Sequence, residues 1–198
     1  MTSKGRRLSL GDLVFHRYDA AGARDRRDQI EEIFRGAYVD RINLGGEFES
    51  PEAFMQRFEA YTRPDRKSGF ELVIAESAGL VCGQAWGWPL RRDSAWWEGL
   101  RLDEAEVGFT TEDGARTFAL SEIMVRSEFM GQGIARALHD ELLGRRAEQR
   151  ATLLVEPGNR RAYEAYQKWG WYRVGSLRPR WPDAPTFDVL MRDLVAGL

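Results

Sequence analysis

Two segments in the first third of the chain have the spacing of apolar residues that is typical of amphipathic helices. Between residues 30 and 37 the apolar positions fall at i, i+3, i+4 and i+7, which places them on one helical face. A second helix is predicted to begin at Ser50-Pro51, because serine is a good N-cap and proline suits the first helical position. It runs to about Tyr61 and stops before Pro64.

Runs rich in β-branched and aromatic residues predict seven strands. The second and third are separated by Ala78-Gly79, which reads as a hairpin turn. Helical spacing returns from 134 to 142 and from 162 to 169, so strands alternate with helices in the second half and predict at least one parallel strand pair. The predicted strands are 14–18, 70–77, 80–88, 117–125, 151–157, 172–177 and 186–191.

Residues 89–116 show neither helical nor strand periodicity and are predicted to be an irregular insertion. The stretch from Asp93 to Asp113 holds seven acids against one base, Arg101, so its local charge is −6. The net charge of the whole chain does not reveal this local excess, since 29 basic and 31 acidic residues leave a net charge of −2. Four of the seven tryptophans lie in or beside the same stretch.

Length and composition predict one domain, residues 13–198, after a loose polar tail at 1–12. With 198 residues and 43% apolar content, the chain can bury a sizeable core. A near-neutral charge argues against nucleic-acid binding, and no apolar run is long enough for a membrane span or a signal peptide. One cysteine rules out an intrachain disulfide, no metal site is expected, and a cytoplasmic protein is predicted, with a homodimer left open.

The segment 125–138, VRSEFMGQGIARAL, carries the most chemical information. A strand ends, a turn with Gly131 and Gly133 follows, and a helix begins. Glycine lets the backbone turn tightly and approach a ligand, and the first N–H groups of a helix attract anions such as a pyrophosphate. Two other interpretations compete: a turn that needs glycine for geometry alone, and a dinucleotide-binding turn, which Arg136 at the third small position disfavours.

This segment resembles the acyl-coenzyme A motif of the GCN5-related N-acetyltransferase (GNAT) superfamily, Arg/Gln-x-x-Gly-x-Gly/Ala, at Gly133 and Ala135. Met130 departs from it, because the family usually has arginine or glutamine there. A second stretch, 159–171, looks like the family's Asn-x-x-Ala-x-x-x-Tyr-x-x-x-Gly-Phe/Trp helix. The resemblance covers about 13–193 and implies an α/β GNAT fold: a mixed, mostly antiparallel sheet of six to seven strands, helices on both faces, and a splay between strands 4 and 5.

The resemblance also implies the cosubstrate, acetyl-coenzyme A, and where it would bind. The pantetheine arm is expected along the fourth strand and near Asn159, and the pyrophosphate at the glycine turn, where Arg136 could supply charge that Met130 lacks. The expected cofactor-binding residues are Ile123, Met124, Val125, Met130, Gly131, Gln132, Gly133, Ile134, Ala135, Arg136, Asn159 and Tyr166.

Two residues are expected to take part in catalysis. Tyr166 matches the family tyrosine near the thioester sulfur, where a phenol can protonate the departing thiolate; by periodicity alone it reads as a core aromatic. Glu122, three residues before Val125, can take a proton from the attacking ammonium or simply bind it. Glu156 is the reserve base, whereas His16, His139 and Cys82 read as structural.

The acceptor is expected to be a primary amine of a small cationic molecule or a peptide, attacking acetyl-coenzyme A directly in a ternary complex. Acidic residues would attract a cation and aromatic walls suit an organic amine, although a solvated acidic loop explains the charge equally well. The expected acceptor-binding residues are Glu47, Trp86, Trp88, Trp97, Glu122 and Trp181. The alternative is a catalytically idle fold that binds acyl-coenzyme A as a sensor or interaction module, with Met130 as its only support.

Overall fold

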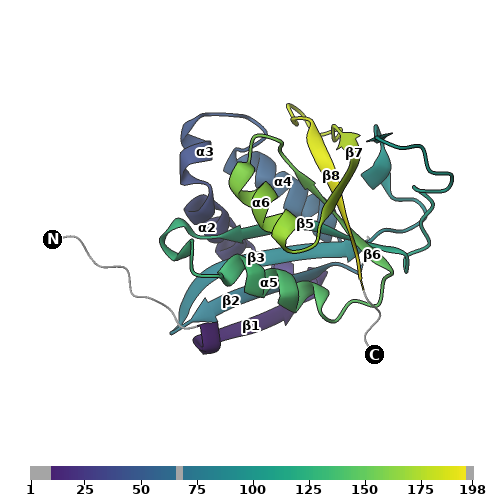
Figure 1. The fold of residues 1–198 in the computed structure, drawn as a ribbon. Helices are drawn as coiled ribbons and strands as arrows, with labels where there is room; N and C mark the ends of the chain where they lie inside the picture. Colours follow the sequence, from purple (N-terminus) through teal and green to yellow (C-terminus); the bar gives the residue numbers. More distant parts are fainter. Residues whose placement is uncertain (1–9, 66–68, 195–198) are drawn as a thin grey trace. The chain divides into compact units, whose positions relative to one another are not determined.

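The computed structural model describes residues 10–65 and 69–194, whose helices and strands are drawn in Figure 1. These residues form two compact units. The first unit includes the described residues up to Gly87 together with Glu122–Arg145. The second includes Trp88–Ser121 and the described residues from Arg146 onward. Most of the predicted N-terminal tail lies outside the described residues, and Leu10–Asp12 form a short 3-10 turn.

The strands of the first unit are antiparallel neighbours. β1 (Leu13–Tyr18) pairs with β2 (Glu71–Ser77), from Leu13 opposite Ser77 to Tyr18 opposite Leu72. β2 pairs in turn with β3 (Leu80–Pro89) through the predicted hairpin. The later half of β5 (Thr117–Val125) completes this unit's strands.

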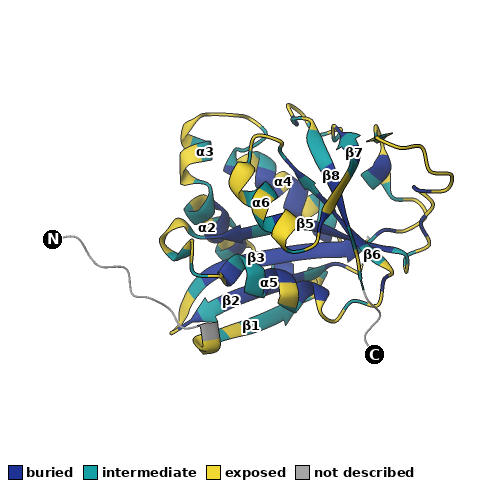
Figure 2. Ribbon diagram, viewed as in Figure 1, coloured by how far each residue is buried: buried dark blue, intermediate teal, exposed yellow. Residues whose placement is uncertain are grey.

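The helices of the first unit cover both faces of these strands. On β3, the Gln84 amide donates to the carbonyl of Ile30 in α2, whereas a Cβ at Gly83 would lie 3.2 Å from Leu138 in α5. Neighbouring strand residues point to opposite faces, so each face meets a different helix. β3 is accordingly buried over most of its length (Figure 2). The helices are α1 (Ala20–Arg24), α2 (Arg27–Ala37), α3 (Val39–Asn43), α4 (Pro51–Thr62) and α5 (Ile134–Leu143).

The second unit is built from the first half of β5 and the remaining strands. β5 pairs in parallel with β6 (Arg150–Val155) over three residue pairs, from Thr117 with Arg150 to Ala119 with Thr152. β6 then pairs with β8 (Phe187–Asp193), β8 with β7 (Tyr172–Leu177), and β7 with β4 (Arg101–Leu102), all antiparallel. α6 (Arg160–Lys168) connects β6 to β7.

The strand order is β1-β2-β3-β5-β6-β8-β7-β4, which confirms a mixed, mostly antiparallel sheet with one parallel pair. The prediction of six to seven strands was short by one, because β4 has only two residues and pairs with β7, far along the sequence. The sequence pattern did not predict α1, whose N-cap Asp19 accepts a hydrogen bond from the Gly22 N–H. None of the described helices has both the length and the apolar character needed to cross a bilayer.

Candidate functional site

The glycine turn before α5 has a backbone that ordinary residues rarely adopt. Gly131 and Gly133 have φ of 79° and 82°, in the left-handed region that favours glycine. Gly133 is the N-cap of α5 and no side chain caps the helix there. The first N–H groups of a helix have no acceptors within the helix, so this exposed turn can hold an anion.

The side chains around the turn add little free positive charge. Met130 is 40% exposed. Arg136, expected to help with phosphate, lies 2.5 Å from Asp140 one helical turn later. Burial raises the pKa of Asp140, but hydrogen bonds from Arg136 and His139 outweigh it and hold that pKa below its ordinary value. The charge of Arg136 is therefore shared with a carboxylate, and the anion-binding capacity rests on the backbone.

The end of β5 that precedes the turn packs closely against β3. A Cβ at Gly83 would lie only 2.5 Å from the carbonyl oxygen of Met124, so only glycine fits there. Met124 and Val125 are buried, and Ile123 is half-buried. Ile123 to Val125, which are expected to lie along the pantetheine arm, thus form a strand end that packs closely against β3.

Glu122, at the start of the first unit's part of β5, carries an unusual carboxylate. In the part of the chain that the structure describes, no hydrogen bond or ion pair reaches it. Burial raises its pKa from 4.5 to about 7, and the positive charge of Arg57 lowers it in part. A carboxylate with a pKa near neutrality can both accept and release a proton under ordinary conditions.

Arg57 of α4 is a charged residue that the sequence reasoning missed. It is 8% exposed, and its guanidinium donates to the Phe48 carbonyl oxygen over 2.8 Å and lies 4.1 Å from the centre of the Phe48 ring. The available signal was an arginine beside the apolar positions Phe54 and Phe58 of one helix. Burying a charged side chain on such a face is costly unless the charge is paired and hydrogen-bonded.

In the second unit, Tyr166 is packed between two tryptophans. Its ring makes edge contacts with Trp169 and Trp171, with centroids 5.6 and 6.2 Å away. Asn159 is the N-cap of α6, where its side chain accepts from the Ala162 N–H over 3.3 Å. The second motif therefore has a clear local role as a capped helix with a buried aromatic face, and its part in cofactor binding stays a prediction.

Three of the four tryptophans expected to bind the acceptor are buried, so little of their side chains is exposed to a ligand. Trp86 is 1% exposed, and its ring centroid lies 5.4 Å from those of both Phe54 and Phe58 in the core of the first unit. In the second unit, Trp88 and Trp97 are 3% and 7% exposed. Only Trp181 keeps a partly exposed side chain.

The acidic insertion is largely neutralised by arginines from the same unit. Glu112 is buried and lies 3.4 Å from Arg150, and Glu98 lies 2.8 Å from Arg180. The local charge of −6 therefore overstates the free negative charge of this segment, and its place on the acceptor side stays a prediction. The five acids with arginine partners are Asp93, Glu98, Asp103, Glu106 and Glu112. In the first unit, Glu47 is exposed.

The remaining reactive side chains have structural surroundings. Cys82 is fully buried in β3, and burial raises the pKa of its thiol. His139 is fully buried in α5, with Nδ1 2.8 Å from Asp140, and His16 lies 3.4 Å from Glu76. Within the described residues no group of three or more histidine, cysteine, aspartate or glutamate residues is arranged to hold a metal.

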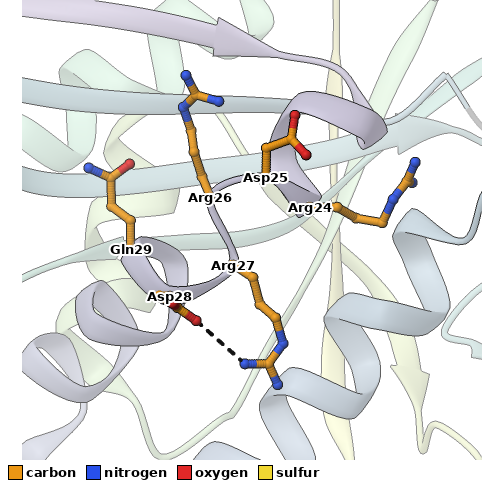
Figure 3. A pocket seen from close by; sticks show the side chains of 6 residues that line it. All are labelled: Arg24, Asp25, Arg26, Arg27, Asp28 and Gln29. Atoms are coloured by element: carbon orange, nitrogen blue, oxygen red, sulfur yellow. Dashed lines mark ion pairs between the residues drawn. The ribbon is translucent and has the colours of Figure 1, made fainter.

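A surface hollow of about 550 Å³ lies beside α1 and the start of α2 (Figure 3). Its arginines are already engaged by protein groups: Arg24 donates to the Thr62 carbonyl, Arg26 lies over the Tyr18 ring, and Arg27 contacts Glu59. The hollow is rich in arginine, but protein groups already hold these guanidinium groups. Its lining residues are Arg24, Asp25, Arg26, Arg27, Asp28 and Gln29.

Comparison with protein families gives one match that covers most of the chain. The model of the Acetyltransferase (GNAT) family matches residues 27–171, which include both the glycine turn and the α6 motif. A comparison with curated protein sequences found no match.

Solved structures of acetyltransferases share the fold. Aminoglycoside 6'-acetyltransferase type Ii aligns over 93% of this chain and 99% of its own, with 15% identity and a TM-score of 0.59. A variant of the spermidine N-acetyltransferase SpeG from Vibrio cholerae aligns over 93% and 95%, with 12% identity and a TM-score of 0.57. A GNAT family acetyltransferase from Elizabethkingia anophelis, with acetyl-CoA bound, aligns over 92% and 99%, with 13% identity and a TM-score of 0.54.

Proposed function

Because the chain belongs to the acetyltransferase (GNAT) family, we propose that it transfers the acetyl group of acetyl-coenzyme A to a primary amine. The amine nitrogen attacks the thioester carbonyl directly in a ternary complex. A C–N bond forms, the C–S bond breaks, coenzyme A leaves as the thiolate, and the amine loses a proton. The observation that carries this proposal is the unpartnered Glu122 carboxylate, on the strand that leads into the glycine turn.

The turn and the strand end before it are the part of the first unit that suits the cosubstrate. Positive φ at Gly131 and Gly133 leaves the backbone bare of side chains, and the uncapped start of α5 presents N–H groups suited to a pyrophosphate. The end of β5, from Ile123 to Val125, would meet the pantetheine arm. Met130 adds no charge, so we expect backbone groups to supply most of the affinity.

Glu122 is the proposed acceptor of the amine proton. An alkyl ammonium has a pKa of about 10.4, so attack requires that it lose a proton first. A carboxyl whose pKa is about 7 is a better base than an ordinary glutamate and is still ionised in part at neutral pH. If Glu122 only anchors the ammonium, its removal raises KM and leaves the pH dependence of kcat intact.

Tyr166 is the proposed donor to the departing thiolate. A thiol pKa of about 8.5 lies below that of a phenol, near 10, so a phenol donates readily only as charge develops on sulfur. General-acid assistance of this kind typically contributes about 10²–10⁴-fold. The packing between Trp169 and Trp171 fixes the direction of the phenol ring.

A second candidate is an idle fold that binds acetyl-coenzyme A as a sensor, and an exposed Met130 in place of the family's usual arginine or glutamine is the observation that favours it. A coenzyme A-release assay separates the two. Wild-type protein is incubated with acetyl-coenzyme A and a panel containing spermidine, an aminoglycoside, amino acids and a short peptide. Thiol release with an acetylated amine in the mass spectrum supports the enzyme; cofactor binding without release from any member supports the sensor.

The cofactor placement has its own test. Gly133→Asp puts a Cβ at a φ of 82° and a negative charge where the pyrophosphate should lie, so acetyl-coenzyme A binding should be lost. Gly79→Asp is the matched control, since Gly79 has a φ of 77°, open space around it and a place in the β2–β3 hairpin. Equal cofactor affinity of the two variants, measured by calorimetry, would contradict the placement.

A further inference from the structure

We propose that the amine acceptor also carries a carboxylate, as an α-amino acid does, and that Arg57 binds this carboxylate while Glu122 receives the ammonium. The inference rests on the proposed function and narrows its substrate class. It replaces a polycationic acceptor by a zwitterionic one. Its basis is a pair of opposite charges in the first unit that are near each other but not joined.

Arg57 is nine-tenths buried, and most of its N–H donors make no hydrogen bond within the described residues. Its guanidinium makes one hydrogen bond, to the Phe48 carbonyl oxygen, and packs on the Phe48 ring. Within the described part of the chain its other N–H groups have no acceptor. They are also absent from the fully enclosed polar atoms, so they keep some contact with solvent. A planar guanidinium with free parallel N–H groups matches a carboxylate in a bidentate fashion.

Glu122 is the complementary group. No described residue bonds to its carboxylate, although the charge of Arg57 is close enough to act on it. Two opposite charges in direct contact would form an ion pair, as Arg150 and Glu112 do. Here neither is used by the other, so each keeps its bonding capacity for a ligand.

The strand pairing places these groups on one face. The Arg126 N–H donates to the Cys82 carbonyl, and Gln84 contacts the Met124 sulfur, so β3 and β5 run antiparallel here. Extending this register by two residues makes Trp86 the cross-strand neighbour of Glu122. On α4, Phe54 and Phe58 flank Arg57 and both contact Trp86. Arg57 and Glu122 thus belong to the two elements that meet at Trp86, one to the helix and the other to the strand.

Trp86 itself belongs to the core and not to the binding surface. Its indole N–H is buried without a hydrogen-bond partner. A buried donor without an acceptor is costly in a protein, and native structures contain few of them. An acceptor with a second positive group would be repelled by Arg57, which argues against a polyamine.

Two arginines bind the loop that contains Phe48 and Glu49, and one of them provides a matched control. Arg57 binds the carbonyl of Phe48, and Arg41 binds the carboxylate of Glu49 in the same loop. Arg41→Gln therefore disturbs the loop without removing a guanidinium from the neighbourhood of Glu122. Arg57→Lys keeps the charge and loses the bidentate geometry.

The experiment compares amino acids with the amines formed by removing their carboxylates. Initial rates are measured for wild-type, Arg57→Gln, Arg57→Lys and Arg41→Gln proteins, with folding checked by melting temperature. We expect wild-type kcat/KM to favour the amino acid at least tenfold, Arg57→Gln to abolish that preference mainly through KM, and Arg57→Lys to restore part of it. Arg41→Gln should keep it.

Other outcomes separate the two proposals. If amines without a carboxylate react as well as amino acids in the wild type, or if Arg57→Gln slows both kinds equally, the zwitterionic acceptor is wrong while the acetyltransferase proposal stands. If no acceptor releases coenzyme A, the proposed function itself fails, and this inference with it.

Discussion

The indole N–H of Trp97 donates a hydrogen bond to Oε1 of Glu112 over 3.0 Å, and the Thr117 hydroxyl donates to the same oxygen over 2.8 Å. Arg150 lies 3.4 Å from that oxygen. Three donors from separate segments therefore converge on one buried carboxylate, which fixes the insertion to the start of β5 and to β6.

Glu112→Ala should therefore destabilise the protein. The substitution leaves a partly buried guanidinium and an indole N–H without their acceptor. Breaking a buried pair costs about 3–5 kcal/mol, and less here because Arg150 also donates to Phe109. We expect a loss of about 2–4 kcal/mol in the free energy of unfolding by urea. Glu104→Ala, at an exposed acid of the same segment, should change it by less than about 0.5 kcal/mol. Equal effects would show that the network contributes nothing specific.

Glu122→Gln should change stability in a pH-dependent way. The pKa of Glu122 is raised in the folded protein to about 7. Between pH 4.5 and 7 the unfolded chain releases this proton while the folded protein keeps it, so the wild type loses stability as pH rises through this window. The variant avoids that loss and should be more stable above pH 7, by at most roughly 3 kcal/mol, with no gain below pH 4.5. Urea melts at pH 4 and 8 measure the difference.

The same substitution tests catalysis. If Glu122 takes the amine proton, wild-type kcat/KM rises with pH through a pKa near 7, and Glu122→Gln lowers the rate and removes that step. A variant that keeps the pH step would assign the proton transfer to another group.

Tyr166→Phe should lower kcat by at least about tenfold with little change in acetyl-coenzyme A affinity. The substitution removes the hydroxyl and keeps the ring contacts with Trp169 and Trp171. Tyr163→Phe, on the same helix, is the control and should keep the wild-type kcat. An unchanged kcat in Tyr166→Phe would leave this tyrosine as a packing residue.

Gly83→Ala should be strongly destabilising. Its Cβ would lie 2.5 Å from the Met124 carbonyl oxygen, so β3 and β5 would have to separate, at a cost of about 1–3 kcal/mol. Gly158→Ala adds the same methyl group in open space and should leave the protein as stable or slightly more so. Thermal melts of the two variants give the comparison. Similar melting temperatures would indicate that the strands adapt.

Long, periodic elements could be predicted from the sequence because local pattern determines them. The helix predicted from Ser50-Pro51 to about Tyr61 is α4, with Ser50 accepting the Ala53 N–H as its cap. β5 has the predicted bounds, 117–125. α1, α3 and β4 were missed, since two to five residues are too few to show a period.

The site was less accessible to sequence reasoning, because its properties depend on distant partners. The glycine turn could be predicted from the sequence, because its positive φ values favour glycine at these positions. Trp86 looks the same in sequence whether it lines a cleft or stacks on Phe54. The charge of Glu112 could not be balanced without knowing that Arg150 lies beside it.

Two of the three boundaries between the units fall inside strands, between Gly87 and Trp88 in β3 and between Ser121 and Glu122 in β5. A fragment ending at either boundary would carry a severed strand with unpaired backbone groups at a new sheet edge. Neither unit is therefore a candidate for separate expression or for fusion as a module. Inserted sequences and tags belong in connections that leave β3 and β5 whole, such as the β2–β3 turn at Gly79, where the surrounding space is open.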